Sequence, residues 1–128
     1  MIKTSVFDSN ILIYYLNGSL NDSVRRQVED MIKLGSFISV ITRIEVLGWS
    51  KNTATSLSSA KDLLKCINEQ ALSEEIVKLC IQLRQNYSLK LPDAMIAATA
   101  LHLEIPLMTR NVKDFQKVSN LEIINPFE

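Results

Sequence analysis

The chain has 128 residues, of which 47% are hydrophobic and 22% charged, and its formal net charge at pH 7 is zero. This length suffices for one domain with its own core, which we place at residues 1–128, and the composition excludes a disordered chain. No apolar run approaches the roughly 18 residues that cross a bilayer, and the first residues lack the pattern of a secretory signal. We therefore expect a soluble, cytoplasmic protein with no membrane partner.

The first half of the sequence predicts alternating strands and helices. The predicted elements are, in order, a strand over residues 2–7, a helix over 10–16, a turn at 17–18, an amphipathic helix that ends at Gly35, a strand over 37–41 and a helix that opens with Thr42. Residues 52–59 are rich in serine and threonine and predict a loop or a weak helix start.

The second half continues the same alternation. Its predicted elements are a short edge strand over residues 65–69, a helix capped by Ser73, a buried alanine-rich helix from Pro92, a strand over 105–108, a helical turn over 112–115 and a strand over 121–124. Strands that alternate with helices form right-handed βαβ units. The sequence thus predicts an α/β fold, a three-layer α/β/α domain with a central, mainly parallel sheet.

Cysteine and histidine residues exclude several kinds of site. Cys66 and Cys80 are fourteen positions apart, without the spacing of a zinc site or a disulfide framework. We expect both to be buried free thiols. His102 is the only histidine and lies late in an apolar helix, where we expect a structural role. Histidine-based catalysis is therefore disfavoured.

Four acidic residues follow predicted strands or begin a predicted helix. Asp8 comes directly after the first strand, Glu45 falls in the first turn after the second, Asp93 begins the alanine-rich helix and Asp114 follows the strand over residues 105–108. In an open parallel sheet, ligands bind beyond the carboxyl ends of the strands. We expect these four side chains to meet at that edge.

Each of these acids also has an ordinary structural interpretation. Thr42 and Glu45 have the spacing of a capping box. Asp93 after Pro92 is a common helix opening, and Asp114 is compatible with an acidic first turn. A carboxylate just past an apolar strand, as at Asp8, is harder to explain in this way.

The electrostatic cost of such a cluster favours a metal ion. Two carboxylates about 4 Å apart repel by roughly 4 kcal/mol at an effective dielectric near 20. A divalent cation turns that repulsion into attraction, and all-oxygen ligands select Mg²⁺, with Mn²⁺ as an alternative. If the four acids form one site, the remaining surface carries about +4, which is compatible with attraction to phosphates.

The sequence resembles the PIN-domain family, in particular the VapC-like toxins of bacterial toxin–antitoxin pairs. The resemblance covers essentially the whole chain. The segments that carry it are V-F-D-S-N at residues 6–10, I-T-R-I-E at 41–45, L-P-D-A-M-I-A-A-T-A at 91–100, L-M-T-R-N-V-K-D-F at 107–115 and I-I-N-P at 123–126. The third and fourth segments are the specific ones.

The resemblance implies a Mg²⁺-dependent endoribonuclease, a hydrolase of phosphodiester bonds, that is usually a homodimer and is inhibited by a cognate antitoxin. By motif, Asp8, Glu45 and Asp93 are the catalytic metal ligands. Many members have an acid where this sequence has Asn111, so the fourth ligand is either Asp114, which we favour, or Asn111. The alternative function is a catalytically silent PIN-like RNA-binding or regulatory module.

Further residues are expected to support this chemistry. The metal would activate a water toward a phosphodiester phosphorus, with Glu45 as a plausible proton acceptor. Asn10 and Thr109 are placed to orient the carboxylates. Arg43 and Arg110 flank the motifs and are candidates for holding RNA phosphates. Two other classes are disfavoured: a dehalogenase-like phosphatase needs an acid at Asn10, and a phosphoacceptor receiver domain needs an acidic pair after the first strand.

Overall fold

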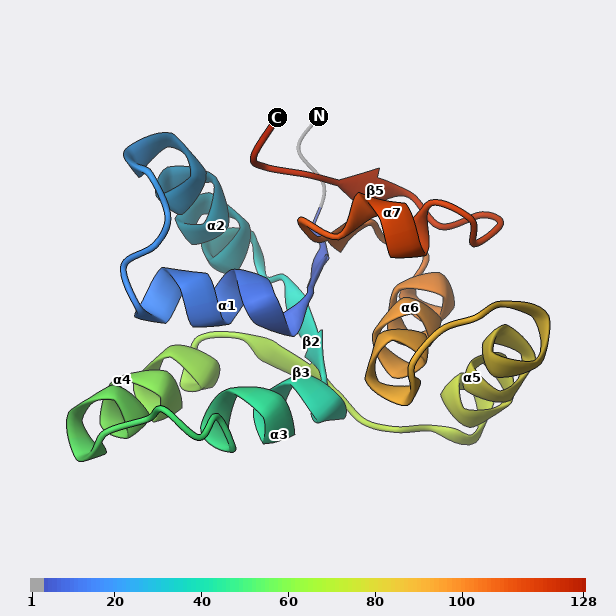
Figure 1. Cartoon of the computed structure of the whole chain (residues 1–128), viewed down its shortest axis with the longest axis horizontal. Helices are drawn as coiled ribbons and strands as arrows, with labels where there is room; N and C mark the ends of the chain where they lie inside the picture. Colours follow the sequence, from blue (N-terminus) through green and yellow to red (C-terminus); the bar gives the residue numbers. More distant parts are fainter. Residues whose placement is uncertain (1–3) are drawn as a thin grey trace.

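Five short parallel strands form the centre of the protein (Figure 1). The structure is a computed structural model that describes residues 4–128. The strands lie in the order β3-β2-β1-β4-β5, and each neighbouring pair is parallel. They are β1 (Val6–Phe7), β2 (Phe37–Ser39), β3 (Asn68–Gln70), β4 (Leu107–Met108) and β5 (Ile123–Ile124). The predicted parallel sheet is confirmed; the start of the strand predicted over residues 2–7 lies outside the described residues.

Helices cover both faces of this sheet. Those within residues 4–128 are α1 (Ser9–Leu16), α2 (Asp22–Leu34), α3 (Val40–Leu47), α4 (Ala54–Lys65), α5 (Glu74–Asn86), α6 (Leu91–Leu103) and α7 (Val112–Phe115). In Figure 1, α1, α2 and α4 lie on the left of the strands and α5 and α6 on the right. The predicted three-layer α/β/α architecture is therefore confirmed.

Alternation along the strands divides the core into two clusters. Val6 and Leu107 face α5 and α6, whereas Phe7 and Met108 face the side of α1, α2 and α4. All four side chains are completely buried, as expected for a sheet covered on both faces. Burial of each such side chain contributes about 1.5–3 kcal/mol. The central strands β1 and β4, which carry two of the predicted site residues at their ends, are thus firmly anchored.

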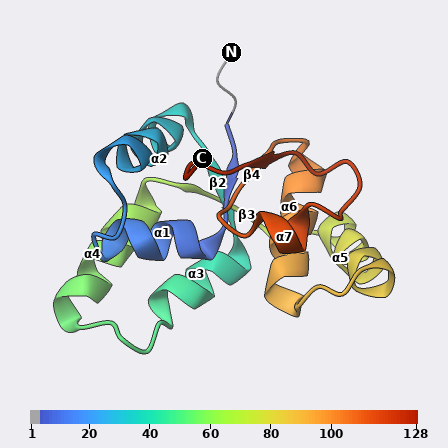
Figure 2. The same cartoon turned by 45° about the horizontal axis from the view of Figure 1, so that its top comes forward.

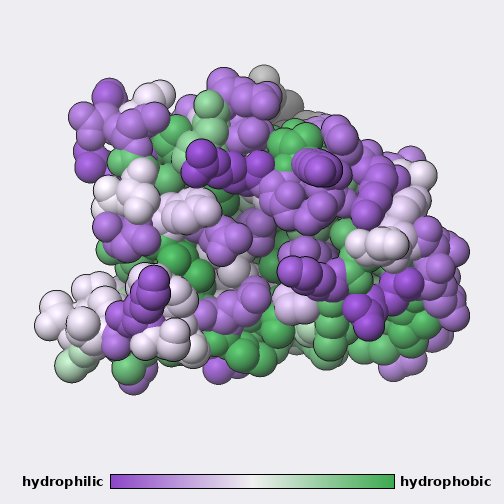
Figure 3. All heavy atoms as spheres, in the orientation of Figure 1, coloured by the Kyte–Doolittle hydropathy of each residue, from purple (hydrophilic) through white to green (hydrophobic). Residues whose placement is uncertain are grey.

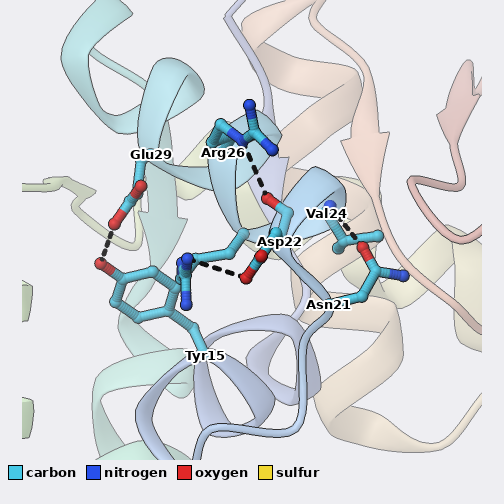
Figure 4. A network of polar contacts seen from close by, with 7 residues as sticks. Tyr15, Asn21, Asp22, Val24, Arg26 and Glu29 are labelled. Atoms are coloured by element: carbon cyan, nitrogen blue, oxygen red, sulfur yellow. Dashed lines mark hydrogen bonds and ion pairs between the residues drawn. The ribbon is translucent and has the colours of Figure 1, made fainter.

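A polar network joins α1 to α2 (Figure 4). The Tyr15 hydroxyl donates a hydrogen bond to Glu29 Oε2 at 2.8 Å, and burial together with this carboxylate raises the pKa of Tyr15. The Asn21 side chain accepts a hydrogen bond from the Val24 backbone N–H at 2.9 Å and caps α2. The Tyr15–Glu29 contact holds α1, whose first residue follows Asp8, against α2.

The predicted end of α2 is confirmed. Gly35 is the C-cap in the left-handed conformation, with φ 94°, which glycine adopts without the penalty of a Cβ atom. The predicted cap of α5 is confirmed as well, because the Ser73 side chain accepts from the Ile76 backbone N–H at 3.3 Å. The chain therefore turns at these positions as the sequence predicts.

The strand predicted over residues 37–41 is shorter than expected. It ends at Ser39, whose side chain accepts from the Ile41 backbone N–H at 3.3 Å and begins α3 at Val40. The prediction that Glu45 lies in the first turn is therefore wrong, and so is the alternative interpretation in which Thr42 and Glu45 form a capping box. Glu45 lies in the second turn of α3, where its carboxylate is available for other contacts.

Other corrections concern the middle of the chain. Residues 52–59, predicted as a loop or a weak helix start, contain the start of α4 at Ala54, where Thr53 and Ser56 form a capping box. The edge strand lies at Asn68–Gln70 rather than at residues 65–69, because α4 continues to Lys65. Cys80 is buried as predicted, but Cys66 is exposed. No helix within residues 4–128 combines the length and apolar character needed to cross a membrane.

Candidate functional site

Asp8 lies at the carboxyl end of β1, in the middle of the sheet. Its backbone N–H donates to the Met108 carbonyl at 2.9 Å, which fixes it against β4. The side chain is only 6% exposed. The pKa of Asp8 is raised to about 6, chiefly because burial disfavours the charged form and also because Asp93 and Glu45 repel it. A cation would relieve both the burial of this carboxylate and its repulsion by Asp93 and Glu45.

Thr109 follows β4 and holds the Asp8 carboxylate. Its hydroxyl donates to Asp8 Oδ2 at 2.7 Å and accepts the Asn111 backbone N–H at 2.9 Å. Thr109 is completely buried. The hydrogen bond from Thr109 lowers the pKa of Asp8, in opposition to burial. The structure thus brings Thr109, predicted to orient a carboxylate, into direct contact with Asp8.

Glu45 reaches the same edge from α3 and is held by Ser9. Ser9 Oγ lies 2.6 Å from Glu45 Oε1 and 3.0 Å from Thr42 Oγ1. Because a hydroxyl has one proton to donate, we assign it to the carboxylate, which makes the shorter and stronger bond. Ser9 and Thr42 are both buried. This contact ties the residue after Asp8 to the second predicted acid.

Sequence reasoning missed the role of Ser9. The only signal was its position between Asp8 and Asn10 in the first motif, and nothing in the sequence showed that α3 would present Glu45 to it. Asn10, which was predicted to orient a carboxylate, is exposed in the first turn of α1. The structure thus places Ser9, rather than Asn10, against a predicted metal ligand.

Asp93 enters from the start of α6, which packs against α3. It is half-buried, and Pro92 precedes it at the start of the helix, as predicted. The pKa of Asp93 is raised, first by burial and then by the charges of Asp114 and Glu45, whereas Lys90 lowers it. The charges of Asp114 and Glu45 therefore act on Asp93, and the charge of Asp93 acts on Asp8.

The two candidates for the fourth ligand are joined to each other. Asn111 Nδ2 donates to Asp114 Oδ2 at 2.9 Å, and both residues belong to the region of α7. Asp114 is exposed, and its charge acts on Asp93. Asn111 therefore orients Asp114 in this arrangement, and Asp114 supplies the negative charge. Figure 2 shows α1, α3 and α7 around the same end of the strands.

The donor set fits a hard divalent cation held partly through water. Within residues 4–128, no three acidic, histidine or cysteine side chains stand close enough together to enclose a metal ion. Mg²⁺ keeps several of its waters and takes only one or two carboxylates directly, so it does not require a closed cage. Burial is the main cause of the raised pKa of both Asp8 and Asp93, and the charge of Asp93 also raises that of Asp8.

The two arginines proposed for phosphate contacts differ in their surroundings. Arg43 Nε and Nη2 donate to Glu69 Oε1 and Oε2 at 2.7 and 3.1 Å, in a bidentate ion pair. The guanidinium carbon of Arg110 lies 4.7 Å from the ring centroid of Phe127 and 6.0 Å from that of Tyr14. Arg43 is therefore engaged by a carboxylate, whereas Arg110 rests on aromatic faces.

Comparison with known proteins identifies the family. Residues 5–121 match the PIN domain. The chain is similar to Ribonuclease VapC2 of Methanocaldococcus jannaschii, at 28% identity over 92% of this chain and 91% of that protein. A toxin–antitoxin complex from Klebsiella pneumoniae contains a chain 34% identical to it, with a TM-score of 0.78 and coverage of 98% of this chain and 99% of that one.

Further solved structures share the fold. A chain of VapBC2 from Rickettsia felis, bound to a promoter DNA fragment, is 23% identical over 96% of this chain and 98% of its own, with a TM-score of 0.83. A chain of VapBC-1 from nontypeable Haemophilus influenzae is 24% identical over 98% of this chain and 100% of its own, with a TM-score of 0.80. The resemblance seen in the sequence motifs is confirmed: this chain belongs to the PIN domain family, and its likeness is to VapC-type members.

Proposed function

We propose that this chain is a Mg²⁺-dependent endoribonuclease of the VapC toxin type. The observation that carries the proposal is the placement of Asp8 at the end of β1, where burial and then the charges of Asp93 and Glu45 raise its pKa, with Asp114 acting in turn on Asp93. Membership in the PIN domain family and similarity to a protein named as a ribonuclease support it. When bound there, Mg²⁺ or Mn²⁺ supplies a Lewis acid that lowers the pKa of a water and offsets charge on the phosphate.

The residues of the chain prepare this chemistry by fixing the carboxylates. Thr109 holds Asp8 Oδ2 and so fixes the orientation of the carboxylate that would bind the cation. Ser9 holds Glu45 Oε1. The other oxygen, Oε2, would accept a proton from the attacking water. Because Ser9 follows Asp8 in the chain, the ligand and the proton acceptor keep a fixed relation to each other.

The same proposal includes a partner protein. The structures most relevant to it are described as toxin–antitoxin complexes, so we propose that a cognate antitoxin binds and inhibits the chain, and that the chain forms a homodimer. Exposed apolar side chains are available for such contacts, among them Ile44, Leu72 and Leu91. Figure 3 shows hydrophobic residues along the lower margin of the face in view.

The test is cleavage of a labelled single-stranded RNA in Mg²⁺ and in EDTA. We expect cleavage by the unmodified protein in Mg²⁺ alone, and a loss of more than about 100-fold in Asp8→Asn and Asp93→Asn. Asp30→Asn, which changes an exposed aspartate in α2, is the matched control and should retain full activity. Cleavage in EDTA, or full activity of both site variants, would refute the proposal. RNA that binds but is never cleaved would support the catalytically silent alternative.

A further inference from the structure

Arg110 emerges from the centre of the candidate site. It stands between Thr109, which bonds the Asp8 carboxylate, and Asn111, which bonds Asp114. Its main chain is therefore fixed at the sheet edge that carries the acids. Its side chain is exposed and extends to Tyr14 of α1 and Phe127 in the segment after β5. The guanidinium thus lies at the rim of the site.

Phe127 forms a fixed platform under this guanidinium. The backbone N–H of Phe127 donates to Asn125 Oδ1 at 3.0 Å. Its ring meets Tyr14 edge-on, with centroids 6.3 Å apart and planes at 90°. Phe127 is partly buried against the core cluster that includes Phe7 and Met108. The platform is therefore held from three sides, by the main chain, an aromatic ring and the core.

A guanidinium group that lies over an aromatic ring keeps the N–H donors at its edge available for hydrogen bonds. All five N–H donors of arginine lie in the guanidinium plane, and an aromatic ring contacts only the face of that plane. Arg43 is different, because Glu69 occupies two of its donors. The side-chain ion pairs within residues 4–128 include Arg25–Asp22 and Arg43–Glu69. Arg110 is therefore the site arginine whose charge is not neutralised by a carboxylate.

We propose that Phe127 is a positioning residue for the substrate: it holds the Arg110 guanidinium flat, so that its in-plane N–H donors bind a phosphate of the RNA strand beside the cleaved bond. This inference rests on the proposed nuclease function. A phosphate oxygen matches the fork of donors that arginine presents. Phe127 lies 17 positions after Arg110 in the chain, so the segment after β5 becomes part of the substrate site.

The inference is tested with variants of Phe127 that separate the effect of its aromatic face from the effect of its apolar bulk. Phe127→Leu keeps an apolar side chain and removes the aromatic face, whereas Phe127→Trp keeps the face. For a labelled single-stranded RNA in Mg²⁺, Phe127→Leu should raise KM by about two- to fivefold with kcat unchanged, and Phe127→Trp should retain the KM of the unmodified protein. Arg110→Ala should raise KM roughly tenfold and reduce the slope of log affinity against log salt by about 0.7.

A double variant decides whether Phe127 acts through Arg110. Adding Phe127→Leu to Arg110→Ala should raise KM no further. Equal effects of Phe127→Leu in both backgrounds, or a lower melting temperature with unchanged KM, would overturn the inference. If Phe127→Leu does not fold, Arg110→Lys serves instead. This variant keeps the positive charge and the salt dependence of RNA affinity but loses the planar set of N–H donors, so an unchanged KM overturns the proposal.

RNA binding is measured alongside cleavage to keep the two proposals apart. Fluorescence anisotropy in EDTA gives the Kd of the same RNA for every variant. If the unmodified protein binds RNA without cleaving it in Mg²⁺, the nuclease proposal fails, whereas the positioning role is still decided by the Kd values. If cleavage depends on Mg²⁺ and none of the variants changes KM or Kd, only the positioning role fails.

Discussion

The buried carboxylate of Asp8 makes a quantitative prediction about the stability of the metal-free protein. Its pKa is raised from 3.8 in the unfolded chain to about 6 in the folded protein. Between pH 3.8 and 6, the folded state therefore keeps a proton that the unfolded state has released. The favourable effect of this proton is complete below pH 3.8 and is lost as the pH rises through 6. At pH 7.5 the charged form therefore destabilises the fold by at most about 3 kcal/mol.

Asp8→Asn removes this penalty, since the neutral amide needs no proton and its oxygen can still accept the Thr109 hydroxyl. We expect the variant to be about 2–3 kcal/mol more stable than the unmodified protein at pH 7.5 in EDTA. The difference should shrink toward zero near pH 4. Urea unfolding at pH 4, 6 and 7.5 measures it, with the exposed Asp30→Asn as the control.

Mg²⁺ should reverse the order of stability. A ligand at 100 times its Kd stabilises the folded state by about 2.7 kcal/mol, and only the unmodified protein retains the Asp8 ligand. The melting temperature of the unmodified protein should therefore rise with Mg²⁺, whereas that of Asp8→Asn should stay nearly constant. Destabilisation by Asp8→Asn at pH 7.5 in EDTA, or a gain that is equal at every pH, would refute the reasoning.

Three further predictions follow from other contacts. Ser9→Ala frees Glu45 Oε1 and should lower kcat roughly tenfold, measured by RNA cleavage; unchanged kcat would contradict the role of Ser9. Thr109→Val should move the pKa of Asp8 above about 6, followed by carboxyl NMR titration in EDTA, and a lower pKa would contradict it. Gly35→Ala forces a Cβ into φ 94° and should cost about 1 kcal/mol of unfolding free energy, whereas a stabilised variant in urea unfolding would show that the backbone relaxes.

The sequence predicts the fold well where several signals agree. Gly35 follows an amphipathic pattern and ends α2 in the left-handed conformation, and Ser73 caps α5. Apolar runs in the strands place Phe7 and Leu107 in the core, as the structure confirms. In these cases a local backbone preference and the burial of side chains point to the same boundary.

The main error at the site arises where a helix cap overrides a composition that suits a strand. The residues around Val40 and Ile41 suit a strand by composition, but Ser39 caps a helix there instead. The shift moves Glu45 into the second turn of α3 and onto Ser9. Such a pairing joins residues 36 positions apart, and no local pattern encodes it.

The sequence motifs indicated which acids belong to the site, but not how each is held. The order of Asp8, Glu45 and Asp93 in the chain predicted a common edge, and the effects of Asp93 and Glu45 on the pKa of Asp8, and of Glu45 on that of Asp93, agree with it. The contact between Arg110 and the ring of Phe127 was not predictable, because it depends on where the segment after β5 returns to α1. Local motifs identify such ligands, whereas the contacts that orient them come from the tertiary fold.

Cleavage of RNA in Mg²⁺ by single and double variants tests most directly whether these acids act as one site. Asp8→Asn and Asp93→Asn should each lower the rate by more than about 100-fold. The double variant should cleave no more slowly than the less active of the two single variants, because either change disables the same metal centre. Losses that multiply, or a variant that keeps full activity, would contradict a shared site at this edge of the sheet.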